Sequence, residues 1–561
     1  MDHGRVSARV SDVESASTKI RPEVTPAPAS VYPSGTHRAM IVCGLLLSTF
    51  VIALDISILA TAIPSITTEF NSLPDVGWYG SAFFLALSAS QSAWGRAYAP
   101  RAEAGGHDPR RAYAAALAVF EAGSLLCGAA RGSAGLVAGR AVQGAGGAGV
   151  SLGAYALAAR VARPEGVPAV VGLVGCVFAV GGVVGPLLGG AFTQAGGWRW
   201  CFYVNLPVGG AAAALVLLFL RPPGPSAEPG DGRRRRPGLS WAARLLGFDP
   251  VGLVLVVAAL LCCFLVFQRA GISQSWGDAS SIVLLLGWVL LTVAFAINEY
   301  WQGERALLVI RILRRRHILA VCCFQFFSFS AYFLLIYNIP IYFQAISGLS
   351  PVESGIRAIP LILCVSLASF ASSVAIGHTG IYQPFLLVGA ALATLGAGGI
   401  LTLGLGSKLG SEIGYQILFG VGVGISLQVP MIVAGAVSPV EEKPLALSAV
   451  LFTQYYAGAC VLAASAGLTN NLLLGRLPRY VAGIDASSVL AVGAAQLQEH
   501  FGGPALQGVR RAFLDGLRAS WVLAMVLAGL SVVAAAVLPV WPGRISLGHV
   551  APAGEHGGDG G

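Results

Sequence analysis

Two ionisable residues of this sequence stand inside long apolar segments, where a charge is costly. Asp55 lies in Leu54-Asp-Ile-Ser-Ile-Leu59, and Arg140 lies in Gly139-Arg-Ala-Val-Gln-Gly144. A carboxylate in the middle of a bilayer costs about 2.5 to 3.5 kcal/mol on insertion scales, so a function must justify its presence. A desolvated carboxyl group can exchange a proton near neutral pH if its surroundings alternately wet and dry. Asp55 is therefore a candidate for proton coupling or substrate handling.

A buried guanidinium needs a partner, and for Arg140 the candidates are Asp55 or a cluster of backbone carbonyls. Glu121, in the preceding apolar segment, is a third intramembrane ionisable group and is assigned to proton coupling by the same reasoning. The competing interpretations are structural. Asp55 could bond to a helix neighbour, and Arg140 could reach the nearer membrane surface, because Arg131 and Gly139 place it only about two turns inside.

The segment from Gly181 to Gly190 reads Gly-Gly-Val-Val-Gly-Pro-Leu-Leu-Gly-Gly. Gly181, Gly185 and Gly189 recur every four residues and form one bare helix face that another helix can approach closely. Pro186 removes a backbone donor and can bend the helix there. Spaced glycines alone indicate only packing. With Gly-Pro inside the motif and Trp198-Arg-Trp200 after it, the pattern is much more specific.

Some uncharged polar residues within apolar segments are candidates to line a substrate cavity: Gln143, Asn338, Gln428 and Gln454. Hydrogen bonding between helices explains such residues at least as well. The ten cysteines lie in or beside apolar stretches, and neither they nor the eight histidines show metal-ligand spacing. We therefore expect no metal and no cofactor, which argues against a membrane-embedded enzyme.

The composition indicates a membrane protein. With 55% hydrophobic and 11% charged residues, the 561-residue chain has too few polar side chains to cover a soluble globule. Charged residues normally make up about a quarter of a soluble chain. The 73 glycines suit the close packing of membrane helices. The net charge of +9 comes from arginines in short clusters between apolar runs, so the expected partner is a lipid bilayer and not a nucleic acid.

Crossing the roughly 30 Å hydrocarbon core takes about 20 helical residues. The sequence predicts an all-α integral membrane fold with fourteen transmembrane helices, at 39–66, 76–98, 112–130, 133–158, 169–194, 203–221, 249–270, 280–298, 317–344, 354–377, 382–404, 411–437, 444–469 and 520–541. Basic residues gather in alternate loops, as cytosolic loops require. Counted from a cytosolic N-terminus, these loops hold Arg96, Arg101, Arg110, Arg111, Arg160, Arg163, Arg221, Arg233 to Arg236, Arg244, Arg305, Arg311 and Arg314 to Arg316. The opposite loops hold only Arg131, Arg199, Arg269 and Lys408.

These features predict a chain organised in two halves. The expected parts are a disordered cytosolic tail (1–38), a six-helix bundle (39–221), a cytosolic basic linker (222–248), two inserted helices with a basic loop (249–316), a second six-helix bundle (317–541) and a cytosolic tail (542–561). The segment 470–519 is expected to lie on the extracellular side, because loops of that length cross the membrane largely regardless of their charge. It is also expected to be partly helical.

Two internal repeats support the paired halves. Gly147-Ala-Gly-Val-Ser-Leu152 recurs as Gly422-Val-Gly-Ile-Ser-Leu427 at an offset of 275 residues. Ala62-Ile-Pro64 recurs as Asn338-Ile-Pro340 at an offset of 276. Paired halves around a central site are the architecture of many secondary transporters.

Several motifs resemble the fourteen-span drug:proton antiporters of the major facilitator superfamily, and in particular the fungal multidrug and toxin efflux pumps. The Gly181 to Gly190 helix is similar to their antiporter motif. The further matches are Phe120-Glu-Ala-Gly-Ser-Leu-Leu-Cys-Gly128, Gly139-Arg140, Trp198-Arg-Trp-Cys-Phe-Tyr-Val-Asn-Leu-Pro207, Ile341-Tyr-Phe-Gln344 and Gly414-Tyr-Gln-Ile-Leu418. The resemblance implies the major-facilitator fold over roughly 39–541, with Asp55 as the first-span motif aspartate and Arg140 as the fourth-span arginine linked to proton transfer.

The loop between the second and third predicted spans departs from the family pattern. In the family it carries a Gly, Asp and basic cluster that gates the cytosolic face. Here it reads Gly95-Arg-Ala-Tyr-Ala-Pro-Arg-Ala-Glu-Ala-Gly-Gly-His-Asp-Pro-Arg-Arg111. Glu103 or Asp108 stands near the right place for the acidic member, but neither spacing fits. The resemblance therefore does not extend to this latch.

The sequence thus predicts a monomeric, proton-coupled exporter of small amphipathic molecules, such as drugs, toxins or secondary metabolites, working by alternating access. The expected location is the plasma membrane, with a vacuolar or vesicle membrane as the alternative. A proton-coupled importer of a siderophore or nutrient is a second interpretation, which the glycine-proline helix disfavours. A receptor or scaffold that transports nothing is a third, but it would not need a buried carboxylate.

Overall fold

The computed structural model describes residues 33, 35–70, 72, 75–99, 108–195, 197–220, 249–271, 274–481, 483–484, 486–492 and 496–537. Within these ranges the chain is helical. The long helices are α2 (Gly35–Phe70), α3 (Val76–Tyr98), α4 (Pro109–Gly128), α5 (Ser133–Val161), α6 (Val167–Ala195), α8 (Asn205–Phe219), α10 (Pro250–Arg269), α11 (Ala279–Gln302), α13 (Arg316–Ala345), α14 (Pro351–Thr379), α15 (Gln383–Leu401), α16 (Leu409–Leu427), α18 (Lys443–Tyr480) and α21 (Gly503–Ala536). Short helices connect them: η3 (Pro164–Gly166), α7 (Trp200–Tyr203), η4 (Gly303–Arg305), α12 (Ile310–Leu313), α17 (Val429–Val437), α19 (Ala486–Val492) and α20 (Leu497–His500).

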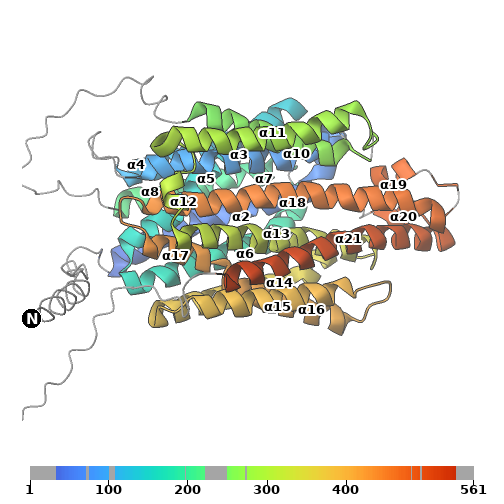
Figure 1. The fold of residues 1–561 in the computed structure, drawn as a ribbon. Coiled ribbons are helices and arrows are strands. Elements are labelled where there is room, and N and C mark those ends of the chain that lie inside the picture. The colour runs from blue at the N-terminus through green and yellow to red at the C-terminus, as the bar shows by residue number, and fades with distance from the viewer. Residues whose placement is uncertain are drawn as a thin grey trace, which may run out of the picture.

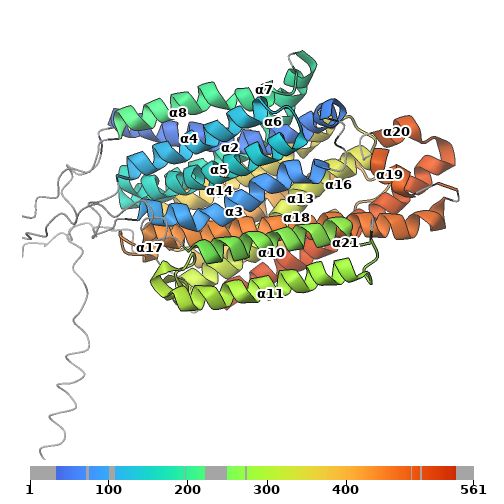
Figure 2. The same cartoon turned by 90° about the horizontal axis from the view of Figure 1, so that it is seen from above.

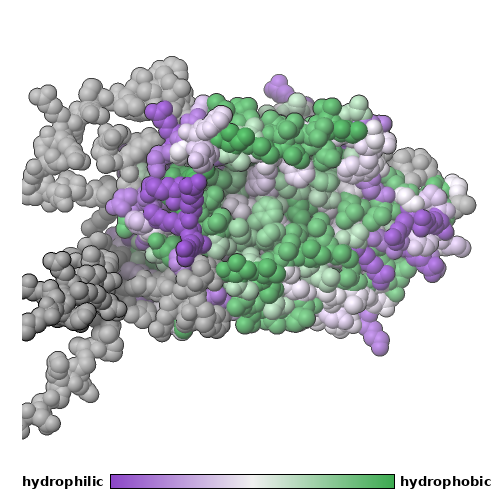
Figure 3. Space-filling model, in the orientation of Figure 1, coloured by the Kyte–Doolittle hydropathy of each residue, from purple (hydrophilic) through white to green (hydrophobic). Residues whose placement is uncertain are grey.

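The long helices run along one common axis, with α19 and α20 beyond one end of the bundle (Figures 1 and 2). On the face seen in Figure 3, a broad apolar band separates two hydrophilic ends. By length and composition, eleven of the described helices can cross a membrane. Long apolar helices side by side have no stable place in water. The chain is therefore a multi-pass membrane protein.

The helix ends differ from the predicted spans. α2 extends from Gly35 to Phe70, so the last residues of the predicted N-terminal tail are already helical. α18 continues to Tyr480, and α21 begins at Gly503, well before the predicted 520, and ends at Ala536. An apolar run predicts the part of a helix inside lipid, whereas the helix itself can continue into water. The rest of the predicted tails and the linker 222–248 lie outside the described residues.

One predicted span is divided. The segment 411–437 forms α16 and α17, which meet at Gln428. Pro430 stands at the start of α17, where a missing backbone N–H is tolerated, and its ring disfavours a continuous helix through the preceding turn. The break leaves Gln428 at a helix junction.

Contacts between the helices fall mainly within two groups. α2 to α8 pack largely on one another and are called the first bundle, and α13 to α21 pack largely on one another and are called the second bundle. Between them in the chain, α10 packs on α11 and against α3 and α18. One pair of equivalent glycines in the internal repeat permits close packing in both bundles. A Cβ at Gly149 of α5 would lie 2.5 Å from the Ala116 Cβ of α4, and one at Gly424 of α16 would lie 2.5 Å from the Val365 carbonyl oxygen of α14. Both glycine-rich helices therefore need these glycines to approach a neighbouring helix.

The two bundles meet along two helix pairs, α3 with α18 and α6 with α14. Small residues line both contacts. A Cβ at Gly95 would lie 2.4 Å from the Ser448 Oγ, and a Cβ at Gly172 would lie 2.8 Å from the Ser373 Cβ. Both pairs are near the end of the molecule that carries Arg96, Arg110, Arg160, Arg311 and Arg315, which we call the basic end. The bundles are thus closely apposed at the basic end.

A strap formed by residues 303–315 crosses from one bundle to the other at this end. Arg96 of α3 donates to the backbone carbonyls of Glu304, at 3.3 Å, and of Ala306. Further along, Arg311 donates to Glu442 at 2.6 Å, and Arg315 also pairs with Glu442, which stands directly before α18. The strap therefore joins α3 of the first bundle to α18 of the second, in the region where the family latch was not found in the sequence.

We expect Glu442→Ala to loosen the strap. Partial burial raises the pKa of Glu442, but the bonds and charges of Arg311 and Arg315 outweigh it and hold the pKa below its usual value. The contribution is thus present at neutral pH and is lost only as the pH falls through that lowered pKa. Losing an ion pair of about 0.6 to 1 kcal/mol should speed tryptic cleavage after Arg311 and Arg315 about three- to fivefold, measured by mass spectrometry. The control is the exposed neighbour, Glu441→Ala. Equal cleavage rates in both variants would contradict the strap.

Candidate ion-pair site

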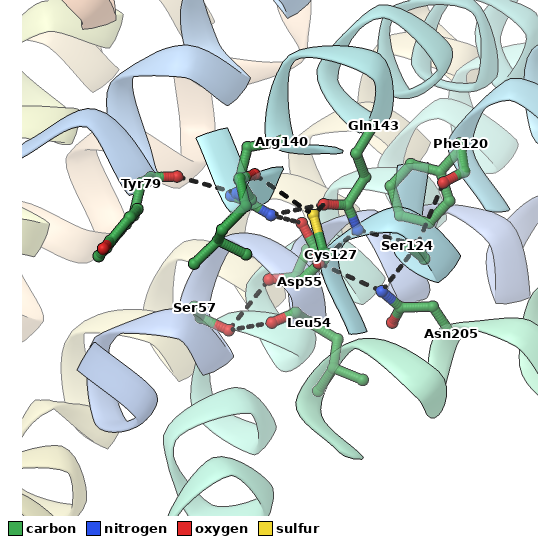
Figure 4. A network of polar contacts seen from close by, with 12 residues as sticks. Leu54, Asp55, Ser57, Tyr79, Phe120, Ser124, Cys127, Arg140, Gln143 and Asn205 are labelled. Atoms are coloured by element: carbon green, nitrogen blue, oxygen red, sulfur yellow. Dashed lines mark hydrogen bonds and ion pairs between the residues drawn. The ribbon is translucent and has the colours of Figure 1, made fainter. Parts of the chain in front are cut away.

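Asp55 and Arg140 form a buried ion pair in the first bundle. Their side chains are 0% and 1% exposed, and Arg140 Nη1 donates directly to Asp55 Oδ2 (Figure 4). Arg140 Nε also donates to the backbone carbonyl of Tyr79 in α3, at 2.9 Å. The structure thus supplies both of the partners considered from the sequence, a carboxylate and a carbonyl, and Arg140 does not extend to a membrane surface.

Amide side chains complete the coordination of the Asp55 carboxylate. Gln143 Nε2 donates to Asp55 Oδ1 at 2.6 Å, and Asn205 Nδ2 donates to the same oxygen at 3.2 Å. Both amide groups also donate to the hydroxyl of Ser124, which donates in turn to the Phe120 carbonyl at 3.1 Å. Gln143 Oε1 accepts from Arg140 Nη1 at 2.8 Å. The ionised carboxylate is therefore held by donors from three other residues, as a buried charge requires.

Glycines bring the helices of this site close enough for these bonds. A Cβ at Gly123 of α4 would lie 2.3 Å from the Gln143 backbone N of α5. A Cβ at Gly144 of α5 would lie 2.2 Å from the Phe83 carbonyl of α3. The ring of Phe83 lies under the guanidinium of Arg140, with 4.5 Å between Cζ and the ring centroid, and adds a cation–π contact. Arg140 is therefore fixed on α5 between α2, which holds Asp55, and α3.

This arrangement supports one chemical step in particular. A neutral Asp55 would lose its charge–charge attraction to Arg140, so protonation weakens the contact of α2 with α5 at this depth. The guanidinium would keep its bond to Tyr79 and its contact with Phe83, both on α3. A proton arriving at Asp55 would thus shift the balance of forces among α2, α3 and α5. An ion pair of this kind can respond to a proton through its own side chains.

Glu121 lies in α4 but outside this hydrogen-bond network. Its carboxylate packs against α8, where a Cβ at Gly209 would lie only 1.7 Å from Oε1. Both oxygens are buried and have no hydrogen-bond partner among the described residues. The predicted group of Asp55, Arg140 and Glu121 is therefore brought together only in part, as the bonded pair of Asp55 and Arg140 with Glu121 on an adjacent helix face.

The glycine face predicted at Gly181, Gly185 and Gly189 packs against α2 in the structure. Cβ atoms there would lie 2.6 Å from the Ala53 Cβ, 1.9 Å from the Ser57 Oγ and 2.1 Å from the Thr61 Oγ1, respectively. The Ser57 hydroxyl donates to the Gly181 carbonyl at 3.0 Å. Pro186 lies within the unbroken helix α6, and Gly190 is on another face, where a Cβ would meet nothing within 4 Å. The bare face therefore touches the turns of α2 on both sides of Asp55.

The uncharged cavity candidates are spread over different environments. Gln143 belongs to the Asp55 network, and Asn338 donates to the Ser465 hydroxyl at 2.9 Å, which is the interhelical bond considered as its alternative role. Gln454 accepts from Gln325 Nε2 at 2.8 Å within the second bundle. Gln428 accepts from the Tyr155 hydroxyl at 3.3 Å and so connects the second bundle to the first.

Asn205 and Ser124 are the site residues that sequence reasoning missed. Both stand within segments singled out by the resemblance, Ser124 in Phe120 to Gly128 and Asn205 in Trp198 to Pro207. Each is 0% exposed, and each bonds to the other and to the Asp55 network. A lone amide in an otherwise apolar segment was the available signal for Asn205, the same signal that selected Gln143.

Comparisons with known proteins agree with this geometry. The sequence model of the Major Facilitator Superfamily matches residues 45–463. The chain is 37% identical over 500 residues to an MFS-type efflux pump of Arthroderma benhamiae, covering 89% of this chain and 91% of that protein. It is 35% identical over 509 residues to the dehydrocurvularin exporter of Alternaria cinerariae, covering 91% and 85%. These relatives are named as transporters and not as enzymes, as the sequence predicted.

A solved structure shares the fold. The proton:xylose symporter XylE superposes with a TM-score of 0.53 at 13% identity, over 91% of this chain and 98% of that chain. At this identity the likeness concerns the arrangement of helices alone. The expected major-facilitator fold is thereby confirmed.

We expect Gly185→Leu to destabilise the protein strongly, because its side chain would enter the space of Ser57 and the Ile58 backbone. Overpacking of this kind costs about 1 to 3 kcal/mol or more. The matched control is Gly182→Leu on the same helix, where a Cβ meets nothing within 4 Å. Thermal unfolding in detergent should show a lowered Tm for Gly185→Leu only. Similar melting of both variants would argue against the close contact of α6 with α2.

A double-mutant cycle should reveal the buried ion pair. Arg140→Met and Asp55→Leu each leave an uncompensated buried charge, at a cost of about 3 to 5 kcal/mol. The double variant Asp55→Leu with Arg140→Met removes both charges and should be more stable than either single variant. Denaturant titration of the purified wild type and the three variants measures their free energies of unfolding. Additive losses in the double variant would show that the two charges do not interact.

Proposed function

Because the chain belongs to the Major Facilitator Superfamily, we propose that it is a fourteen-span, proton-coupled efflux transporter that exports small amphipathic molecules by alternating access. The observation that carries the proposal is the buried pair of Asp55 and Arg140, a titratable carboxylate held among helices that must move in the cycle. The substrates are drugs, toxins or secondary metabolites. The relatives named as an efflux pump and an exporter support this direction.

Three further helices complete the fourteen spans. α3, α4 and α5 have 23, 20 and 29 residues, which suffices for a bilayer core of roughly 30 Å. They are less apolar than the other eleven spans, since they contain polar residues, among them Gln91, Glu121, Arg140 and Gln143. Those polar residues face other helices and are largely buried, so lipid does not meet them. The basic end then faces the cytosol by the positive-inside rule.

Proton coupling follows from alternating exposure of Asp55. In one state the carboxylate is paired with Arg140 and closed to solvent, as seen here. In the other state water reaches it from outside, a proton binds, and the attraction that holds α2 against α5 is lost. One proton moving down 100 mV supplies about 2.3 kcal/mol, enough for a substrate ratio of about fiftyfold. Glu121, buried on α4 near this network, is a second carboxyl group for the proton.

The glycine face of α6 supports coupling between the proton site and the contact of the two bundles. It brings α6 against the part of α2 that carries Asp55, so a movement of α2 at Asp55 acts directly on α6. α6 is in turn one of the two helices of the first bundle that contact the second. We assign the protein to the plasma membrane and expect it to work as a monomer, since the site is complete within one chain.

Asp55→Asn tests the proposal directly. The amide cannot ionise, so the variant should bind substrate but lose gradient-driven transport at least tenfold. The assay uses inside-out vesicles acidified within and Nile red as the probe, and an exporter driven by proton antiport should accumulate the dye. Asp278→Asn, at an exposed carboxylate before α11, is the matched control and should transport normally.

The same assay separates the possible outcomes. Unchanged accumulation in Asp55→Asn would remove this residue from coupling. Depletion of the dye from acidified inside-out vesicles, in place of accumulation, would indicate a symporter that imports its substrate.

A further inference from the structure

One face of α3 carries polar groups that the proton site does not use. Ser88, Gln91 and Ser92 are each 0% exposed. Among the described residues, no partner accepts from or donates to either hydroxyl or to either amide atom of Gln91. Serines in membrane helices usually bond to their own backbone one turn earlier, as Ser48 and Ser124 do here. Leaving a buried polar group unpaired costs about 1 to 3 kcal/mol, so this cluster requires an explanation.

The positions of these residues show where the face points. Phe84, Ser88, Gln91 and Gly95 follow one another at intervals of four, three and four residues, which is one stripe along a helix. At one end of the stripe Phe84 packs edge-on against Phe333 of α13, with 5.2 Å between ring centroids. At the other end Gly95 packs against Ser448 of α18. Both contacts are with the second bundle, so Ser88 and Gln91 between them also face the interface of the two bundles.

A neighbouring face of α3 packs within the first bundle. Phe83 lies over Gly144 and Gly147 of α5, and Tyr98 donates to the Gly149 carbonyl at 2.9 Å. At 3.6 residues per turn, Ser88 is turned about 140° around the helix from Phe83, whereas Gln91 stands between Tyr98 and Phe84. Ser88 is therefore turned away from α5, and Gln91 lies on the edge of α3 where the two bundles meet.

The second bundle presents matching groups at the same depth. Gln325 of α13 is eight residues from Phe333, and Ser92 is eight residues from Phe84, each about 12 Å towards the basic end. Gln325 donates to Gln454, but its own Oε1 is buried without a partner among the described residues. Phe329 stacks on Phe333 with 5.2 Å between centroids. The interface at this depth thus combines amide and hydroxyl groups with aromatic rings.

The charges nearest to this region are already engaged. Arg140 lies beyond Phe83 and is paired with Asp55, and Arg96 donates to carbonyls of the strap. A charged ligand would find no opposite charge here to offset its desolvation. Carboxamide and hydroxyl groups offer both donors and acceptors to an uncharged ligand.

We propose that Ser88, Gln91 and Ser92 of α3, opposite Gln325 of α13 and beside the Phe84 and Phe333 rings, form the polar subsite that binds an uncharged aromatic substrate through its hydroxyl and carbonyl groups. This inference rests on the proposed transport function and names its substrate class. The same helix carries the Tyr79 carbonyl that binds Arg140, so substrate and proton both act on α3.

The test measures binding to purified protein in nanodiscs at pH 6, without any gradient. The probes are neutral 7-hydroxy-4-methylcoumarin, 4-methylcoumarin, which lacks the hydroxyl, and the cation rhodamine 6G. The wild type should prefer the hydroxylated coumarin. Gln91→Leu should weaken that binding about three- to tenfold, the loss of one or two hydrogen bonds, and leave 4-methylcoumarin within about twofold. Gln416→Leu, at a buried glutamine of α16, is the control and should change neither.

Several results would overturn the subsite. These are an unchanged preference in Gln91→Leu, tighter binding of rhodamine 6G than of the neutral coumarins, or no binding of either coumarin by the wild type. If Gln91→Leu does not fold, Ser88→Ala with Gln91→Met gives the same comparison. Asp55→Asn should keep the preference for the hydroxylated coumarin whether or not this variant still transports. Failure of proton coupling and failure of the subsite therefore give different results.

Discussion

The ion pair between Asp55 and Arg140 is the constraint on which the rest of the first bundle depends. Two charges without water are stable only when every lone pair and proton has a partner, and this requires backbones closer than ordinary side chains allow. Gly123 of α4, Gly144 of α5 and Gly185 of α6 meet that requirement, because each stands where a Cβ would collide with a neighbouring helix. The close approach of helices at these glycines is thus linked to the charge in the interior.

α3 occupies a special position in this arrangement. One face contacts α5, receives the guanidinium of Arg140 on the Tyr79 carbonyl and places Phe83 beneath it. The other face contacts α13 and α18 of the second bundle. A displacement of Arg140 therefore acts on the helix that also forms the interface between bundles. Coupling between the ion pair and the contact of the two bundles needs one rigid element that touches both. The 23-residue helix α3 is such an element.

The sequence predicted the membrane class and the pairing of Asp55 with Arg140 well, because both depend on the free-energy cost of placing charged groups in lipid. A carboxylate and a guanidinium in apolar segments are rare enough to identify each other, and the structure joins them. The sequence was less informative about contacts that depend on packing between distant segments. Asn205 was missed because nothing local shows that α8 lies beside Ser124, and the position of Glu121 against Gly209 depends on the same contact. Helix ends were also missed, because the length of an apolar run indicates which residues lie in lipid and not where the helical hydrogen bonding ends.

The strap at the basic end has two unlike anchors in series. The first, from Arg96 to backbone carbonyls, is buried, whereas Arg311 in the second is 53% exposed. Dissolved ions screen charges in contact with water far more than charges out of contact with it. Ionic strength therefore acts on one anchor and spares the other. The salt content of the solution bathing this end thus sets how firmly the second bundle is tethered, while the strap stays attached to the first.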